Sequence, residues 1–168
     1  MSDARSFIYQ WAGREWTKKI HSGWLGLDYL GGERFGQLRV KPGDQVFVVS
    51  VRLGELFLGG RVVVAKLCDL HTAASSLVRD PDDLWPASQY VIAEPSTVKD
   101  LIPWLTVPAA VVDQLEMLSP SGKVRTVKRG DDGGIDPQTL RYLGELMPTS
   151  AQALTRELER VFSGAWER

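Results

Sequence analysis

Apolar residues along this chain follow two spacings, one typical of strands and one typical of helices. Continuous or alternating runs of β-branched and aromatic residues are typical of strands that a sheet covers on one or both faces. Such runs predict strands over residues 5–11, 45–51, 56–67, 89–93 and 123–127. The turn at residues 52–55 is expected to join the second and third of these strands as a hairpin. Gly59 and Gly60 interrupt the longest run and predict a bulge or a barrel corner.

Apolar residues three and four positions apart predict helices over residues 15–21, 96–102 and 108–118, and again from residue 136 onward. Residues 69–83 are expected to form a helical or irregular connection. Pro148 breaks the last helical pattern, and Thr149 or Ser150 is expected to cap the helix that follows. The mixture of strands and helices predicts an α+β fold in a single domain over residues 1–168, with 136–168 as a C-terminal helical elaboration.

The composition limits the class of protein. A chain of 168 residues is long enough to form one core without covalent help. Cys68 is the only cysteine, and His21 and His71 have no ligand spacing, so we expect no disulfide, no metal and no cofactor. The first residues lack the apolar stretch of a signal peptide, and no run of about 18 apolar residues occurs. These observations predict a cytoplasmic protein without a membrane partner.

The charge of the chain argues against broad phosphate binding. The formal net charge is -1, whereas proteins that neutralise many phosphates usually carry a basic excess. Any such contact therefore needs a local patch. The densest basic run contains Lys123, Arg125, Lys128 and Arg129. This run is either a solvated hairpin or a patch of that kind.

Sequence motifs for catalysis are missing. The chain has no phosphate-binding loop, no dinucleotide-binding glycine pattern and no nucleophile elbow. The clustered carboxylates lie in turn-rich sequence, where aspartate is favoured for backbone reasons. They are Asp80, Asp82, Asp83, Asp131 and Asp132. We therefore expect no catalytic residues and no enzymatic activity.

Tryptophans give a stronger signal. The chain has six, and Trp11, Trp24 and Trp85 stand beside turn residues instead of inside apolar runs. Indole faces in loops stack on nucleobases and attract methylated or cationic groups. The alternative is that each tryptophan closes the end of a barrel with its large apolar surface.

Four short motifs together resemble a known superfamily. They are Phe7-Ile8-Tyr9, Ser22-Gly23-Trp24, the Pro42-Gly43-Asp44-Gln45-Val46-Phe47 segment, and Gly54 through Gly59-Gly60-Arg61-Val62-Val63. Their order is similar to that of PUA-like proteins, most closely the EVE and YTH branches, over residues 5–120. The resemblance implies a small, strongly bent β-barrel flanked by helices. It also implies a non-catalytic module that holds a modified base in an aromatic cage.

The resemblance assigns a role to each candidate residue. Trp24 and Trp85 become the walls of the cage, with Tyr29 as a third side. Ser50 is placed at the pocket floor, and Gln10 and Trp11 beside the bound nucleotide. Contacts with the nucleic-acid backbone are assigned to Lys18, Lys19 and Arg34. The implied partner is DNA or RNA that carries a modified, methylated base in a single-stranded or flipped state.

Two other hypotheses belong to different classes. One is a nuclease or hydrolase of the related ASCH branch, in which lysine, aspartate and histidine near the same pocket perform chemistry. The other is a protein-interaction domain whose C-terminal helices bind a partner and whose tryptophans are structural.

Overall fold

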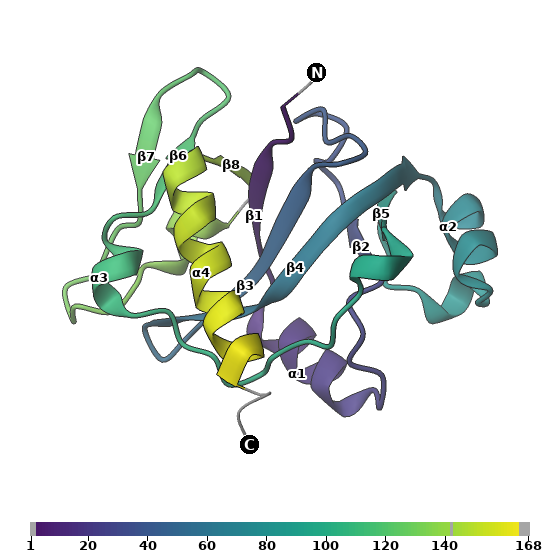
Figure 1. Cartoon of the computed structure of the whole chain (residues 1–168), viewed down its shortest axis with the longest axis horizontal. Helices are drawn as coiled ribbons and strands as arrows, with labels where there is room; N and C mark the ends of the chain where they lie inside the picture. Colours follow the sequence, from purple (N-terminus) through teal and green to yellow (C-terminus); the bar gives the residue numbers. More distant parts are fainter. Residues whose placement is uncertain (1–2, 142, 165–168) are drawn as a thin grey trace.

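The computed structural model describes residues 3–141 and 143–164. Their strands are β1 (Ser6–Gln10), β2 (Tyr29–Gly32), β3 (Gln45–Arg52), β4 (Glu55–Cys68), β5 (Gln89–Ala93), β6 (Glu116–Leu118), β7 (Val124–Thr126) and β8 (Gly144–Leu146). The helices are α1 (Gly13–His21), α2 (Leu70–Leu77), α3 (Ala109–Val112) and α4 (Pro148–Gly164). Three 3-10 turns are η1 (Pro81–Asp83), η2 (Pro95–Thr97) and η3 (Pro137–Leu140). Figure 1 shows how these elements are arranged.

The strands form one sheet in the order β2-β5-β4-β3-β1-β8-β6-β7. β1 runs parallel to β3, and the other pairings between these strands are antiparallel. The predicted α+β class is therefore confirmed. The sheet is open, with β2 and β7 at its edges, so the closed barrel implied by the resemblance is not confirmed.

A bulge bends the long hairpin of β3 and β4. The pairing shifts between Val48 and Val49, which face Gly60 and Leu58, so Gly59 is the extra residue. A Cβ on Gly59 would overlap Leu101 Cδ1 and would lie 2.7 Å from Trp16 Cη2. Glycine is required here because two side chains pack directly onto its backbone. The bulge predicted from the two glycines is confirmed.

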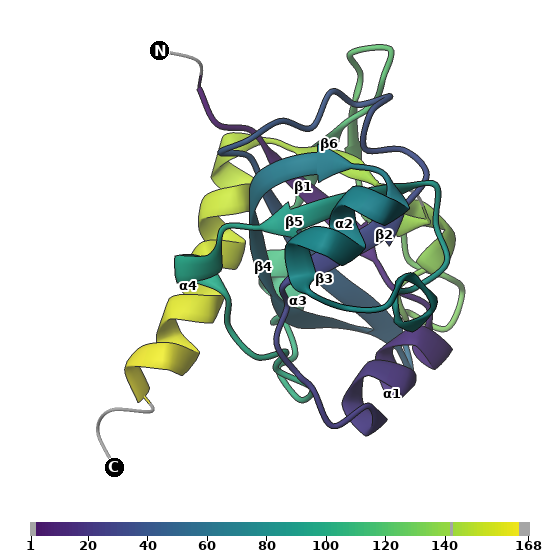
Figure 2. The same cartoon turned by 90° about the vertical axis from the view of Figure 1, so that its right-hand side faces the viewer.

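Apolar side chains on both faces of the sheet explain the continuous runs in the central strands. Ile8, Phe47 and Val49 face one core, which Leu154 of α4 closes. Phe7, Val46 and Val48 face a second core, which contains Trp16 of α1. A smaller cluster lies under α2 around Tyr90. Figures 1 and 2 show α4 lying along one side of the strands.

Two predicted helices are mostly wrong. Within residues 108–118 only α3 is helical, and Glu116–Leu118 is strand β6. Within residues 96–102 the only helical element is the 3-10 turn η2, which begins at Pro95. The backbone amides of Leu101 and Ile102 instead bond to the carbonyls of Leu25 and Gly59. These tertiary hydrogen bonds replace the bonds that a helix would have made.

The helical prediction from residue 136 onward is correct only for its second half. Residues before Pro148 form η3 and then strand β8, which pairs with both β1 and β6. The predicted cap is also wrong, because α4 already begins at Pro148. Ser150 Oγ instead accepts the backbone N–H of Glu116 at 2.8 Å. None of the helices in the described ranges is long and apolar enough to cross a membrane.

Candidate functional site

A cleft of about 610 Å³ brings most of the predicted site residues together. Its walls are α1 with the loop that follows it, β2, and the connection from α2 to β5. Figure 2 shows α1 below α2 on this side of the molecule. The predicted residues that line the cleft are Trp11, Lys18, Lys19, Trp24, Tyr29 and Trp85. This volume falls within the usual range for small-molecule sites, about 300–1,000 Å³.

Trp24 forms the wall on the α1 side. Gly23 precedes it at φ +79°, a left-handed conformation that turns the chain after the helix. Ser22 Oγ accepts the backbone N–H of Trp24 at 3.2 Å. The indole packs on Gly26, where a Cβ would lie 3.1 Å from Trp24 Nε1. Trp24 still has 56% of its surface exposed, which leaves indole surface available to a ligand.

Trp85 also lines the cleft, and two tyrosines hold its backbone. The Tyr29 hydroxyl accepts the Trp85 N–H at 3.0 Å, and the Tyr90 hydroxyl donates to the Trp85 carbonyl at 2.5 Å. Burial raises the pKa of Tyr29, so its hydroxyl remains protonated at neutral pH. Lys18 Nζ lies 5.0 Å from the centroid of the Trp85 ring. Tyr29 thus lines the cleft and also positions the tryptophan.

Trp11 lines the cleft beyond the end of β1. Its N–H donates to the Val49 carbonyl at 2.8 Å, and its ring meets Trp16 edge-on at 6.4 Å between centroids. Ser50 is fully buried, and its hydroxyl donates to the Trp11 carbonyl at 2.9 Å. Ser50 therefore fixes the backbone of Trp11 by a hydrogen bond, and it is not among the residues that line the cleft.

Gln10 and Arg34 also lie outside the lining of the cleft. The amide end of Gln10 is 2.9 Å from the carbonyl oxygens of Leu140 and Pro137, and hydrogen bonding assigns its NH₂ group to them. Gln10 thus connects β1 to η3. Arg34 is exposed in the segment after β2. Both residues therefore lie apart from the group that lines the cleft.

Arg79 is the main site residue that the sequence did not indicate. Its guanidinium carbon is 5.7 Å from the Trp24 ring centroid and 5.8 Å from the Tyr29 ring centroid. It pairs with Asp28 through both terminal nitrogens, at 3.3 Å for the Nη1–Oδ1 contact. Val78, just before it, ends α2 in the left-handed region at φ 54° and ψ 52°. Arg79 thereby connects the α2 side of the cleft to the loop of Trp24.

Comparisons with protein-family models, with curated proteins and with solved structures find no match. The interpretation of this cleft therefore depends on its own geometry and on the short motifs.

Besides Tyr29, burial shifts the pKa of two further groups that line the cleft. The Tyr9 hydroxyl donates to the Gly31 carbonyl at 2.8 Å, and burial, assisted by Glu15 and Glu33, raises its pKa to about 12. Burial also lowers the pKa of Lys19, whose Nζ donates to the Gly26 carbonyl at 2.9 Å. The cleft thus combines aromatic faces with three cations, Lys18, Lys19 and Arg79, and three carboxylates, Glu15, Asp82 and Asp83. Across the described ranges, no three His, Cys, Asp or Glu side chains are placed to hold a metal ion.

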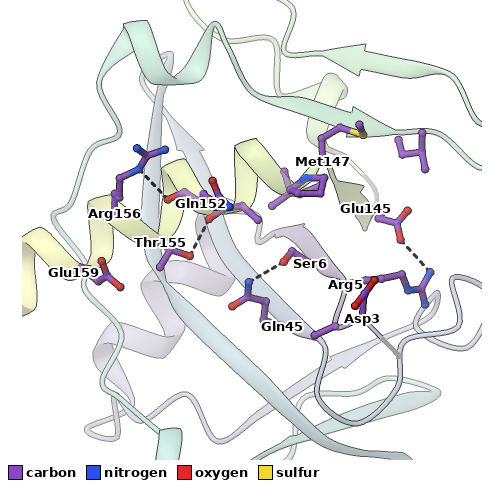
Figure 3. A pocket seen from close by; sticks show the side chains of 15 residues that line it. Asp3, Arg5, Ser6, Gln45, Glu145, Met147, Gln152, Thr155, Arg156 and Glu159 are labelled. Carbon is purple, nitrogen blue, oxygen red and sulfur yellow. Dashed lines mark hydrogen bonds and ion pairs between the residues drawn. The ribbon is translucent and has the colours of Figure 1, made fainter. Parts of the chain in front are cut away.

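A second cavity of about 690 Å³ lies between α4 and the start of β1 (Figure 3). Its polar groups are largely satisfied by one another. Arg5 pairs with Glu145 at 3.1 Å, and Gln45 donates to Ser6 at 2.7 Å. No predicted site residue lines this cavity. The aromatic cleft is therefore the better candidate for a ligand site.

Proposed function

We propose that this chain is a non-catalytic module that binds a modified, methylated base of DNA or RNA in the aromatic cleft. The observation that carries the proposal is the convergence of Trp11, Trp24 and Trp85 on one cleft. These residues come from three separate segments, and none of them is fully buried. Side chains that only closed a core would not need to line an open space.

The energetics favour a flat aromatic ligand. Stacking of a base on an aromatic side chain is worth about 1–3 kcal/mol, and a base between Trp24 and Trp85 would gain this on two faces. A methyl group that fills the remaining space adds about 0.8 kcal/mol. Such a base must first leave its own stack, so the ligand is a single strand or a flipped nucleotide.

The cations in the cleft distinguish a nucleotide from a methylated lysine. Lys18 lies over the Trp85 ring and Arg79 over the Trp24 ring. A cationic ligand would meet these like charges at the ring faces it needs. A nucleotide brings a neutral base together with an anionic phosphate that Lys18 can pair with, whereas Arg79 is already paired with Asp28. The position of Lys18 therefore favours the nucleotide, although Glu15, Asp82 and Asp83 also line the cleft.

The architecture is compatible with a PUA-like fold, which forms part of the same proposal. The long strand β4 bends at Gly59 and pairs with β3 along its first part and β5 along its second. A strand shared in this way curls the sheet, as a strongly bent barrel requires.

The test compares binding of short single strands with and without a methylated base. We expect wild type to prefer the methylated strand and the Trp24→Ala/Trp85→Ala variant to lose at least tenfold in affinity, since 1.4 kcal/mol corresponds to tenfold. Trp104→Ala is the matched control, because Trp104 is 63% exposed and does not line the cleft. Circular dichroism confirms that each variant is folded.

Four outcomes contradict the proposal. If wild type shows no preference for a methylated base, or the folded double variant binds equally well, the tryptophans are structural. Turnover of the strand indicates a nuclease or hydrolase instead. Capture of a protein partner that the Trp24→Ala variant still binds indicates an interaction domain.

A further inference from the structure

The hairpin of β6 and β7 forms a basic projection at the edge of the sheet. β7 is the edge strand, and all three of its residues are exposed. Figures 1 and 2 both show the connection between β6 and β7 extending beyond the rest of the sheet. We define the basic hairpin as residues 116–130.

The cations of the basic hairpin are mostly unpaired. Arg129 pairs with Asp113 at 2.9 Å and donates to the Gly133 carbonyl at 2.9 Å. Lys123, Arg125 and Lys128 are exposed and have no ion pair among the described residues. No acidic residue occurs from 117 to 130. Three exposed positive charges therefore lie within six residues, two near the tip of the hairpin and Lys128 at its base.

This clustering stands out against the charge of the whole chain. The sequence has 20 basic and 21 acidic residues, so charge is balanced overall but separated locally. Arg125 lies in β7 and Lys123 immediately precedes this strand, so the two exposed cations are two positions apart at the tip of the hairpin. A concentrated positive surface attracts polyanions even when the net charge is near zero.

We propose that the basic hairpin binds the phosphate backbone of a single-stranded nucleic acid, as a second contact besides the aromatic cleft. The proposal takes its class of ligand from the proposed function. It assigns a role to cations that do not line the cleft and that have no ion pair in the described part of the chain.

The position of the basic hairpin sets the length of strand that reaches both surfaces. β2 lines the cleft at one edge of the sheet, and β7 is the opposite edge. Eight strands at a spacing of about 4.8 Å would place these edges roughly 35 Å apart in a flat sheet. The sheet curls until the Tyr9 hydroxyl of β1 bonds to the Gly31 carbonyl of β2, so the real distance is shorter. A stacked strand advances about 3.4 Å per nucleotide, so about ten nucleotides are the upper limit.

Edge protection is the rival explanation for the same side chains. Lysines on an edge strand prevent pairing with another copy of the chain. Edge protection predicts self-association when the charges are removed and no effect on nucleic-acid binding. Lys128 lies beyond the end of β7, where it would not protect the strand.

The experiment measures affinity for an unmodified strand of about 15 nucleotides over a range of salt concentration, a length that exceeds the estimated span. Each phosphate contact contributes about 0.7 to the slope of log K against log salt for single strands. We expect the Lys123→Gln/Arg125→Gln/Lys128→Gln variant to lower the slope by about 2. Arg129→Gln is the matched control, because Arg129 is already neutralised by Asp113, and its slope is expected to stay near wild type.

A single methylated nucleoside provides the second measurement, because it has no phosphate for the basic hairpin to bind. We expect the triple variant to bind it like wild type. The inference is overturned if the triple variant keeps the wild-type slope, whether or not it self-associates, or if wild type does not bind the long strand. Salt-dependent binding of the long strand without a preference for methylated bases would leave the basic hairpin intact and reject the cleft proposal.

Discussion

Gly59 lies where α1 and the segment before Trp104 cross the bend of β4. Trp16 and Leu101 pack against its backbone at a distance that excludes any side chain. The position of α1, and with it Lys18 and Lys19, depends on this contact. A single hydrogen atom as a side chain therefore determines how close one wall of the cleft approaches the sheet.

Gly59→Ala should lower the free energy of unfolding by about 1–3 kcal/mol or more, because the added methyl group overlaps Leu101 and Trp16. Urea unfolding measures the change. Gly13→Ala is the control, since nothing lies within 4 Å of a Cβ there and alanine favours the helix. Equal stability of the two variants would contradict the packing argument.

Tyr9 should make the protein sensitive to alkaline pH. Its pKa is about 12 in the folded state and about 10 in an unfolded chain. The unfolded state therefore releases the proton first, so stability is retained below pH 10 and is lost as pH rises toward 12. Two units correspond to roughly 3 kcal/mol at most.

Unfolding in urea at pH 9 and pH 11.5 tests this with wild type and Tyr9→Phe. At pH 9 the variant should be less stable by about 1 kcal/mol, because it lacks the bond to Gly31. The difference should shrink or reverse at pH 11.5. Parallel behaviour of the two proteins would show that Tyr9 does not cause the alkaline loss.

Helix α4 is the element that completes the core on its side of the sheet. Leu154 and Leu158 of α4 pack with Ile8, Phe47 and Val49 from the central strands. Strand β8, immediately before the helix, inserts between β1 and β6. Residues 144–158 therefore belong to the main sheet and its core.

Leu154→Ala should lower the free energy of unfolding by about 2–5 kcal/mol, because Leu154 is fully buried and the core cannot collapse completely around the cavity. Leu53→Ala is the control, since Leu53 is fully exposed in the hairpin turn. Thermal unfolding followed by circular dichroism compares the two. A loss for Leu154→Ala as small as that for Leu53→Ala would contradict a structural role for α4.

The sequence predicted the strands with continuous apolar runs and also the short strand β7, which lies within the predicted range 123–127. β1, β3, β4 and β5 appear where continuous apolar runs occur, because both faces of these strands are buried. β6 and β8 have three residues each, too few to distinguish a strand from one turn of a helix. β8 is a strand because it pairs with β1 and β6, both distant in sequence, and β6 pairs with β8 as well as with the neighbouring β7. No local pattern records the distant pairings.

The same limit applies to the cleft. Trp24 and Trp85 could be singled out because each is a large apolar residue beside turn residues. Arg79 could not, because its role depends on the left-handed Val78 and on Asp28, 51 positions earlier. Ser50 was assigned to the pocket floor, although its hydroxyl is engaged by Trp11. Spacing alone does not show whether a polar group meets a ligand or the backbone.

The whole molecule shares one sheet between two large cores. β3 contributes Phe47 and Val49 to one core and Val46 and Val48 to the other. Neither core can lose its packing without disturbing the strand that the other core also uses. The two halves are therefore coupled through their common strands.

We expect a single cooperative unfolding transition in urea. Far-UV circular dichroism reports the sheet, and tryptophan fluorescence reports the surroundings of Trp16 and of the cleft. The two signals should change with the same midpoint, as in two-state unfolding. Separate midpoints would show that one core melts independently.

The walls of the cleft come mainly from two connections, while the sheet supplies their support. One connection carries Trp24 and the other carries Trp85. Tyr29 and Tyr90 hold the Trp85 connection to the sheet, and Arg79 joins it to the Trp24 connection through Asp28. Residues between these contacts can change during evolution without altering strand pairing. Related chains could therefore diverge in ligand preference while retaining the same framework, and the three supporting side chains would be the slowest of the site to vary.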